Sequence, residues 1–498
     1  MRGMHRIVVL MLASLACSAQ SAKELLQTAS EMVSTASPGM QVPALLELAP
    51  LYQDSDKKKT LELLDQAMGA STTAALQARV VRTAAGIDVD KAIEMAPSVP
   101  VQQRAEALER IVTALVAQKR LDRAVEVLDS SAGQGGYPFG AADNLLSKLA
   151  DDDPRRPSLF ASATAALDPS VRHSAYAIML AHQWRSLPLP LVDGAVTRLV
   201  NSILDRKDDA TVTSTISSSL GSVSFNDDKD YQLFEIMHIL QLVDPKRTAQ
   251  LKEKRPALAA ALEKFPEGRL SMKASDSDTI HTNRSARDKK APTDPQEASK
   301  MQWNALSEAR SQEAMTLAAK DVQLGVSRAA EVPDPYLRAI TLAEIAQLAA
   351  GKDPATAKSV IGQAITAMKG IKDPQATAGI WAAVASAATE VKDDEMARDA
   401  IDKGLAACAA LYKLDANADD PNTAPRENWP SMQHYRNLLY KAAKENGTET
   451  PLLLVKINDP DLQLMGRIEI ARSLMGKPRG DLEVWVFRGN FGTASSLR

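Results

Sequence analysis

The chain has 498 residues, enough for two or three ordinary domains or one long solenoid. Its formal net charge is −3, so composition gives no global bias toward nucleic acid or an anionic membrane. Aromatic residues make up only 4% of the chain, which is low for a protein that stacks sugars or bases on rings.

Residues 1–22 have the order of a cleavable signal peptide. A basic start precedes a short apolar run, Ile7–Ala16, and small residues follow it. The run is too short to span a bilayer, and no later stretch is long and apolar enough to do so. We therefore expect export to the periplasm or the extracellular space, with cleavage after Ala19 or Ala22.

Cys17 leaves a second processing route open. A bacterial lipoprotein is cut just before a lipidated Cys, usually with Leu three residues upstream, and here that position is Ser14. If the signal is removed downstream of Cys17, Cys408 is the only remaining thiol, and no internal disulfide can form.

The dipeptide Asp-Pro recurs far more often than this composition predicts. It begins at residues 153, 168, 244, 294, 334, 353, 373, 420 and 459. An Asp carboxylate accepts the free N–H groups of a first helical turn, and Pro suits the next position because no N–H is needed there. The dipeptide therefore indicates a repeated helix start.

Residues 23–265 are predicted to form an N-terminal helical-repeat segment with almost no strand signals. Apolar spacing predicts helices at Thr60–Met68, Arg104–Ala117, Leu121–Leu128, Val171–Ala181, Val196–Leu204 and Tyr231–Val243.

Residues 266–293 are predicted to be a flexible polar linker, because large apolar side chains are scarce there. Basic residues in this stretch have no interleaved aromatics, which favours a tether over a nucleic-acid site. They are Arg284, Arg287, Lys289 and Lys290.

Residues 294–476 are predicted to form a C-terminal helical-repeat segment. Within 334–411, helix pairs repeat about every forty residues, which is typical of a solenoid. The second helix of one pair has an apolar stripe at Ala357, Val360, Ile361, Ala364, Ile365 and Met368, which recurs at Ala397, Ala400, Ile401, Gly404, Leu405 and Cys408. The first helices, Tyr336–Ala350 and Ala376–Ala388, are so apolar that neighbours must cover nearly all of their surface.

Two stretches of the C-terminal half break this pattern. Residues 413–431 are predicted to be an irregular loop, and residues 477–498 a tail. Within the tail, Glu483–Phe487 could be a short strand or an unstructured end.

The stacked helix hairpins resemble the tetratricopeptide-like and HEAT-like α-solenoid families. The resemblance covers 24–262 and 299–412, and Leu115–Asp129 is most similar to a tetratricopeptide helix junction. The period of about forty departs from the tetratricopeptide period of about 34, and the regular Trp, Gly and Tyr positions of that motif are missing. The resemblance transfers no functional residue; it implies a scaffold that binds proteins or peptides.

Histidines offer no metal site by spacing. His173 and His182 share a predicted helix but point to opposite faces, and His238 stands among core positions. We expect structural or surface roles for all three, because metal sites need clustered ligands.

Nucleophile motifs and phosphate-binding loops are absent from the sequence. Ser55-Asp56-Lys57-Lys58 matches Ser-x-x-Lys, but it lies in a charged turn without companion motifs, so chance explains it. Cys408 lies on an apolar stripe, which indicates a buried, inert thiol.

Asp415–Asp420 begins like a calcium loop, with oxygen donors at its first, third and fifth positions. Asp420 replaces the expected Gly and Arg426 the expected Glu, so a solvated acidic loop is favoured over calcium binding at 415–427. Asp227–Asp230 is a still weaker match.

Together, these features predict an all-α protein of tandem helical hairpins in two segments. We expect an exported, non-enzymatic scaffold for a protein or peptide partner, without cofactor, metal, catalytic residues or nucleic acid. An exported carbohydrate-active hydrolase or lyase on a helical toroid is one alternative. A lipid-anchored envelope assembly factor, held at the membrane through Cys17, is another.

Overall fold

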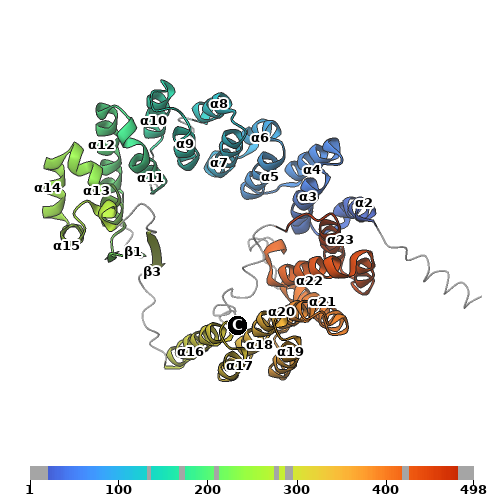
Figure 1. The fold of residues 1–498 in the computed structure, drawn as a ribbon. Helices are drawn as coiled ribbons and strands as arrows, with labels where there is room; N and C mark the ends of the chain where they lie inside the picture. The colour runs from blue at the N-terminus through green and yellow to red at the C-terminus, as the bar shows by residue number, and fades with distance from the viewer. Residues whose placement is uncertain are drawn as a thin grey trace, which may run out of the picture. The chain divides into compact units, whose positions relative to one another are not determined.

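The computed structural model describes residues 21–131, 136–167, 174–206, 212–273, 280–286, 295–417 and 426–479. These residues are almost entirely helical, and successive helices pack as hairpins (Figure 1). The predicted all-α fold of tandem helical hairpins is therefore confirmed. Contacts group the chain into two compact units, Ser71–Ala291 and Met1–Ala70 with Pro292–Arg498.

The unit Ser71–Ala291 begins with four helix pairs. They are α5 (Ala74–Ile87), α6 (Val89–Met95), α7 (Val101–Ala117), α8 (Leu121–Ser131), α9 (Phe139–Leu146), α10 (Arg155–Ala165), α11 (Ser174–Gln183) and α12 (Leu189–Asp205), with short 3₁₀ turns η2 (Ala96–Ser98) and η3 (Trp184–Ser186). The odd-numbered helices pack side by side in one row, and each also packs against the helix that follows it.

The same unit ends in a mixed helix and strand cluster. It contains β1 (Val212–Ser218), β2 (Gly221–Phe225), α13 (Asp228–Val243), α14 (Pro245–Lys254), α15 (Pro256–Lys264), η4 (Gly268–Met272) and β3 (His281–Ala286). The strands form an antiparallel sheet in the order β2-β1-β3. All six predicted helices of the N-terminal half are present, and strands are few there, although β1 and β2 had no recognisable signal in the sequence.

Part of the predicted linker is ordered against α13. Gly268 has a φ of +65°, and a Cβ on it would lie 2.2 Å from the Phe234 carbonyl oxygen, so only glycine allows this close approach. Arg269 forms an ion pair with the buried Glu235 of α13, and Met272 is fully buried. The linker prediction was therefore wrong for 268–272 and for the β3 residues 281–286.

The second unit contains the first and the last helices of the chain. They are α2 (Ala22–Met32), α3 (Pro38–Tyr52), α4 (Lys57–Ala70), α16 (Pro295–Ala318), α17 (Val322–Ala330), α18 (Pro335–Ala350), α19 (Pro354–Ala367), α20 (Pro374–Glu390), α21 (Asp394–Asn417), α22 (Pro430–Asn446) and α23 (Pro460–Leu474). Short 3₁₀ segments are η1 (Val33–Thr35), η5 (Arg426–Asn428) and η6 (Gly447–Lys456). Helices α16, α18, α20 and α22 pack side by side in one row.

The Asp-Pro dipeptide starts helices as predicted. The Asp carboxylate accepts first-turn N–H groups at α14, α18, α19, α20 and α23, from Asp244, Asp334, Asp353, Asp373 and Asp459. Asp153 instead accepts from the Arg155 N–H, so α10 begins one residue later. The copies at 168 and 420 lie outside the described residues, as does Asp294 before α16.

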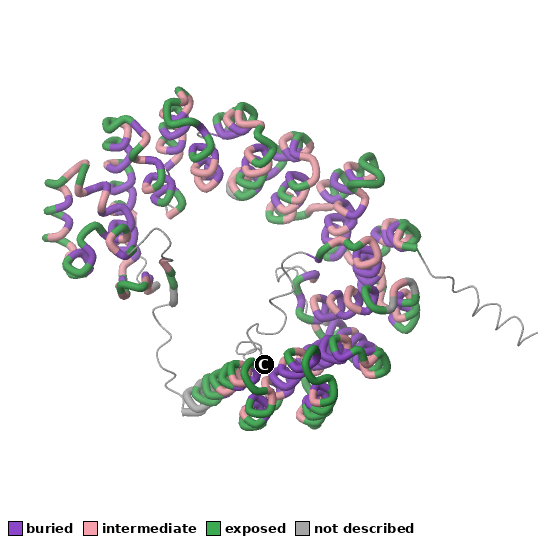
Figure 2. Tube along the Cα trace, viewed as in Figure 1, coloured by how far each residue is buried: buried purple, intermediate pink, exposed green. Residues whose placement is uncertain are grey.

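Burial follows the predicted periodicity. In α21 all six predicted stripe positions are buried, and in α19 the first four are buried. Helices α18 and α20 are buried along most of their length, with Trp381 only 7% exposed (Figure 2). Small alanine side chains allow α20 to pack closely among its neighbours.

The irregular stretch predicted at 413–431 is shorter in the structure. Helix α21 continues through Asn417, and α22 begins at Pro430, so the prediction was wrong at both ends. Asp415 therefore lies on a helix, where its carboxylate accepts a hydrogen bond from the Ser431 hydroxyl at 2.7 Å.

The N-terminal helices pack on the C-terminal ones. Helices α2 and α3 contact α23, with Leu25, Leu26 and Ala29 of α2 buried. The Ser37 N–H and hydroxyl both donate to the Asp461 carboxylate, at 2.8 and 2.5 Å. This grouping differs from the predicted division in chain order at 265 and 294, because contacts between distant segments outweigh those between sequence neighbours.

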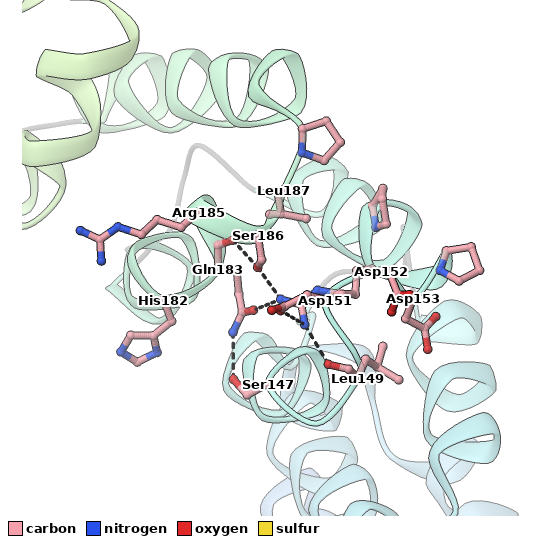
Figure 3. Close-up of a pocket in the computed structure, with 14 residues that line it drawn as sticks. Ser147, Leu149, Asp151, Asp152, Asp153, His182, Gln183, Arg185, Ser186 and Leu187 are labelled. Atoms are coloured by element: carbon pink, nitrogen blue, oxygen red, sulfur yellow. Dashed lines mark hydrogen bonds and ion pairs between the residues drawn. The ribbon is translucent and has the colours of Figure 1, made fainter.

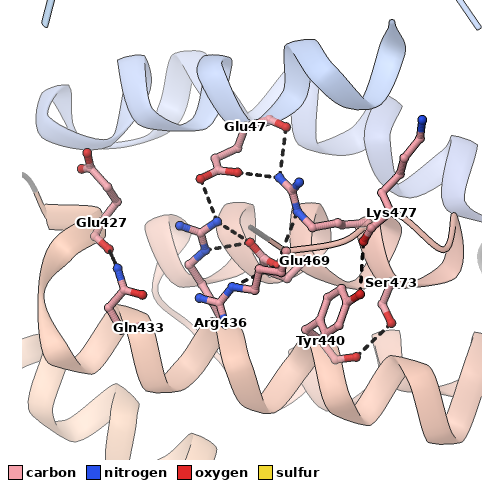
Figure 4. Close-up of polar contacts among 10 residues, drawn as sticks. Glu47, Glu427, Gln433, Arg436, Tyr440, Glu469, Ser473 and Lys477 are labelled. Atoms are coloured by element: carbon pink, nitrogen blue, oxygen red, sulfur yellow. Dashed lines mark hydrogen bonds and ion pairs between the residues drawn. The ribbon is translucent and has the colours of Figure 1, made fainter. Parts of the chain in front are cut away.

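A buried ion-pair network joins α3 to α22 and α23 (Figure 4). Arg436 Nη2 lies 2.8 Å from Glu47 and 2.5 Å from Glu469, and Arg472 lies 2.5 Å from Glu47. Burial lowers the pKa of Arg436, but the two glutamates outweigh it and hold the pKa above its ordinary value. Arg479 also approaches Glu469, at 3.8 Å, and burial lowers its pKa to about 10.

We predict that Glu469→Gln destabilises the protein by about 3–5 kcal/mol, because it leaves buried arginines without their counter-charge. Urea unfolding followed by circular dichroism measures this change. The control is Asp402→Asn, which removes the exposed pair with Lys456 and should cost less than about 1 kcal/mol. Equal losses in the two variants would contradict the stabilising role of the network.

Candidate functional site

A pocket of about 810 Å³ lies where two hairpin loops of the unit Ser71–Ala291 meet (Figure 3). One loop joins α9 to α10, and the other runs from the end of α11 through η3 to α12. The lining residues are Ser147, Leu149, Asp151, Asp152, Asp153, Pro154, Arg156, Pro157, His182, Gln183, Arg185, Ser186, Leu187 and Pro188. Because α9 and α11 are row neighbours, these loops come together at one edge of the row.

Arg156 holds the two loops together from below the pocket. Its guanidinium donates to the carbonyls of Leu146 and Leu149, at 2.8 and 2.9 Å, and so satisfies the end of α9. It also donates to Gln183 Oε1 at 3.0 Å and to Ser186 Oγ at 2.5 Å. Arg156 is only 4% exposed, so these charge-assisted bonds fix the pocket floor.

The carboxylate of Asp143 orients His182. His182 Nδ1 lies 2.7 Å from Asp143 Oδ2. Gln183 Nε2 donates to Asp143 Oδ1 at 2.7 Å and to Ser147 Oγ at 2.9 Å. The hydrogen bond to Asp143 raises the pKa of His182 above its ordinary value. The Asp143 carboxylate therefore has both oxygens occupied, and His182 presents its other ring nitrogen outward.

The rim of the pocket carries charges of both signs. Asp153 is paired with Arg155 at 2.7 Å, and hydrogen bonds from that side chain and backbone lower the pKa of Asp153 to about 2. Asp151 is 90% exposed and 3.5 Å from Arg156. Across the pocket, Arg185 lies over the ring of Trp184, 5.1 Å from its centroid.

The arrangement is suited to recognition. Among the described residues, no serine hydroxyl is hydrogen-bonded to His182, so no serine nucleophile is activated there. No group of three or more His, Cys, Asp and Glu side chains in the described ranges is placed to hold a metal. A rigid polar floor with charged rims is the kind of surface that fixes the orientation of a bound polar segment.

Histidine and cysteine candidates lie apart from one another. His182 lines the pocket, whereas His238 is half-buried on α13, where burial and Arg185 lower its pKa to about 4. Cys408 is fully buried on α21, and burial raises the pKa of its thiol. The buried thiol is confirmed, and His173 lies outside the described residues.

The acidic candidates serve as caps and ion pairs. Within the Ser-x-x-Lys match, Asp56 accepts a hydrogen bond from the Lys59 N–H at the start of α4. Asp227 caps α13 by accepting from the Lys229 N–H. Asp228 and Asp230 pair with Arg206 and Arg255, respectively.

The remaining candidates are only partly described. Asp415 and Asn417 lie in the last turn of helix α21, and residues 418–425 lie outside the described ranges. Arg284 lies on β3, opposite Ser214 of β1. Arg287, Lys289 and Lys290 lie outside the described residues.

The sequence analysis did not predict the pocket, although some of its residues form a recognisable charge pattern in the sequence. The run Asp151-Asp152-Asp153 followed by Arg155 and Arg156 is the densest local charge pattern of that region. A charge run ordinarily indicates a solvated face, and nothing in it shows that Arg156 is buried.

Matches to known proteins were found among solved structures. No family model and no curated protein matches the chain. Among solved structures, the crystal structure of the APC/C hetero-tetramer Cut9–Hcn1 is 13% identical and covers 91% of this chain and 95% of that chain, with a TM-score of 0.17. A circular tandem repeat protein with novel repeat topology and enhanced subunit contact surfaces is 11% identical and covers 92% and 96%, with a TM-score of 0.14. These scores are low, so the fold assignment rests on the helix packing itself.

We predict that Asp143→Asn lowers the pKa of His182, because the variant removes the charge that favours the protonated imidazole. The pair stabilises the fold below about pH 6.5, and this contribution is lost as the pH rises through the raised pKa. NMR titration of the His182 ring measures the shift, with the adjacent Asn144→Ala as control. An unchanged midpoint in Asp143→Asn would contradict the pairing.

Proposed function

We propose that this chain is a non-enzymatic scaffold that binds a protein partner, and that it acts in the cell envelope or outside the cell after export. The observation that carries the binding role is the pocket between two successive hairpin loops. Its floor is fixed by Arg156, so a bound segment meets a surface that is already ordered. Stacked hairpins place such loops side by side along one edge.

The pocket favours binding over glycoside hydrolysis. A glycosidase needs one carboxyl group whose pKa is raised by burial so that it acts as the acid. Asp151 and Asp152 are exposed, Asp153 is held by Arg155, and Asp143 is held by His182 and Gln183. The carbohydrate-active alternative therefore finds no support from this site, and nothing in the described contacts requires nucleic acid or a cofactor.

Membrane contact is a separate question. No helix in the described part of the chain is long and apolar enough to cross a bilayer. A lipid anchor on Cys17 remains the alternative route to an envelope location, and we rank it below release of the signal after Ala19.

The start of α2 supports one cleavage position. Ser21 Oγ accepts from the Glu24 N–H at 3.3 Å, and the Glu24 carboxylate accepts from the Ser21 N–H at 2.8 Å, which is a complete capping box. Cleavage after Ala22 would remove this cap, while cleavage after Ala19 keeps it. Cys17 and Ala19 also supply the small-x-small pattern, whereas Gln20 precedes Ala22 in that place.

We predict that the mature protein begins at Gln20, because that product retains the capping box of α2. Intact-mass measurement of the purified exported protein checks this. A start at Lys23 would contradict the cleavage position but keep export, a lipidated Cys17 would establish the anchored alternative, and an uncut chain would contradict export.

Partner binding is tested by crosslinking the full mature chain in its native cell envelope and identifying the captured proteins by mass spectrometry. We predict one dominant partner that is lost when Asp151 and Asp152 are both replaced by Lys. The control replaces Glu94 and Glu126, exposed on α6 and α8, by Lys in the same way. Capture unchanged by the pocket variant would place binding elsewhere, and no partner above background would contradict the scaffold proposal.

A further inference from the structure

The carboxylates of the pocket fall into two classes. Asp143 and Asp153 already have cationic or amide partners at hydrogen-bond distance. Asp152 makes no hydrogen bond or ion pair with any described residue, and Asp151 has only the contact at 3.5 Å with Arg156. Two neighbouring carboxylates at the mouth therefore retain their capacity to accept from a ligand.

The backbone that carries these two carboxylates is held in place. The Asp153 N–H donates to the Ala150 carbonyl at 3.0 Å, which closes a turn around Asp151 and Asp152. On one side of that turn Arg156 anchors the Leu149 carbonyl, and on the other Arg155 anchors Asp153. Asp151 and Asp152 therefore lie on an ordered turn, so binding does not have to order this loop first.

Apolar walls adjoin the carboxylates. Leu149, Pro154 and Pro157 line the pocket from the α9–α10 side, and Leu187 and Pro188 line it from the other loop. Long basic side chains bury their methylene stems along such walls while the charged end stays among polar groups.

The cations of the pocket neutralise this pair only in part, because Arg156 lies 3.5 Å from Asp151 whereas Asp152 has no ion pair with a described residue. In Figure 3, His182 in the last turn of α11 and Arg185 of η3 lie apart from Asp152. His182 is engaged with Asp143, and Arg185 lies over Trp184. Asp152 therefore keeps its negative charge for an incoming ligand, and the charge of Asp151 is opposed only by the 3.5 Å contact with Arg156.

We propose that this pocket binds an extended segment of the protein partner through an Arg or Lys side chain, whose cation is held by Asp151 and Asp152 and whose stem lies along the Leu and Pro walls. The proposal rests on the scaffold function and names the chemistry of its ligand. Arginine is favoured, because a guanidinium can donate to two carboxylates at once.

Binding of three labelled peptides to the full mature chain, followed by fluorescence anisotropy, tests this. The peptides are Gly- and Ser-rich and carry Arg-Arg, Gln-Gln or Glu-Glu at the centre. We expect the Arg-Arg peptide to bind at least about tenfold more tightly than the other two, and its affinity to fall with added salt.

The variant Asp151→Asn with Asp152→Asn should weaken the Arg-Arg peptide by about tenfold or more, because it removes both charges while keeping the side-chain shapes. Glu94→Gln with Glu126→Gln changes the net charge equally and should leave the affinity unchanged. Because all four side chains are exposed, unchanged melting curves will show that both variants are folded.

Equal weakening by both double variants would show that peptide affinity depends only on net charge, and would overturn the proposal. Preference for the Glu-Glu peptide, or no binding of any peptide, would overturn it as well. A partner captured from the envelope despite these outcomes would keep the scaffold function and reject only this ligand, so the two failures are distinguishable.

Discussion

The unit formed by the two ends of the chain depends on one buried carboxylate, Glu469, and on the arginines around it. Glu469 is fully buried on α23, and Arg436 connects it to Glu47 of α3. Charges removed from water are tolerated only when each has a partner, so the position of α3 and the positions of α22 and α23 are mutually constrained. Ser37 and Asp461 repeat the same connection between the two ends. Helix α23 is thereby joined to α3, because Arg472 pairs with Glu47, which lies 425 residues earlier in the sequence.

Helix starts and apolar stripes could be predicted from the sequence, whereas contacts between segments far apart in the chain could not. The Asp-Pro starts and the apolar stripe of α21 are found in the structure because caps and helical periodicity depend only on residues within a few positions. The pairing of Glu47 with Arg436 leaves no local pattern, so the grouping of the first helices with the last could not be read from the sequence. Strand β1 was not predicted because Ser and Thr fill most of its positions, and within 213–218 only Ser214 and Ile216 are buried. The ordered part of the predicted linker depends on contacts with distant residues, such as the ion pair of Arg269 with Glu235 and the burial of Met272, that composition cannot reveal.

The candidate site shows the same division. The acidic run at 151–153 is visible in the sequence. That it borders a pocket depends on the burial of Arg156 and on the neighbouring segment 182–188, which the sequence does not show. A solenoid brings such loops together by stacking, so recognition surfaces arise between elements that are separated in sequence by a whole hairpin. Arg156 fixes that surface, while Asp151 and Asp152 are left exposed at its mouth. This edge of the row therefore combines a buried cation that orders the loops with exposed anions that, in our proposal, bind the partner.

Hydrogen exchange of the full chain and of Glu47→Gln, followed by mass spectrometry, tests most directly whether the two ends of the chain are coupled through this network. We predict that the substitution on α3 raises amide exchange in α22 and α23 as well as in α2 and α3, while α5 to α12 keep their protection, because stability is shared across the buried ion pairs. Faster exchange confined to α3, with α22 and α23 unchanged, would contradict the account.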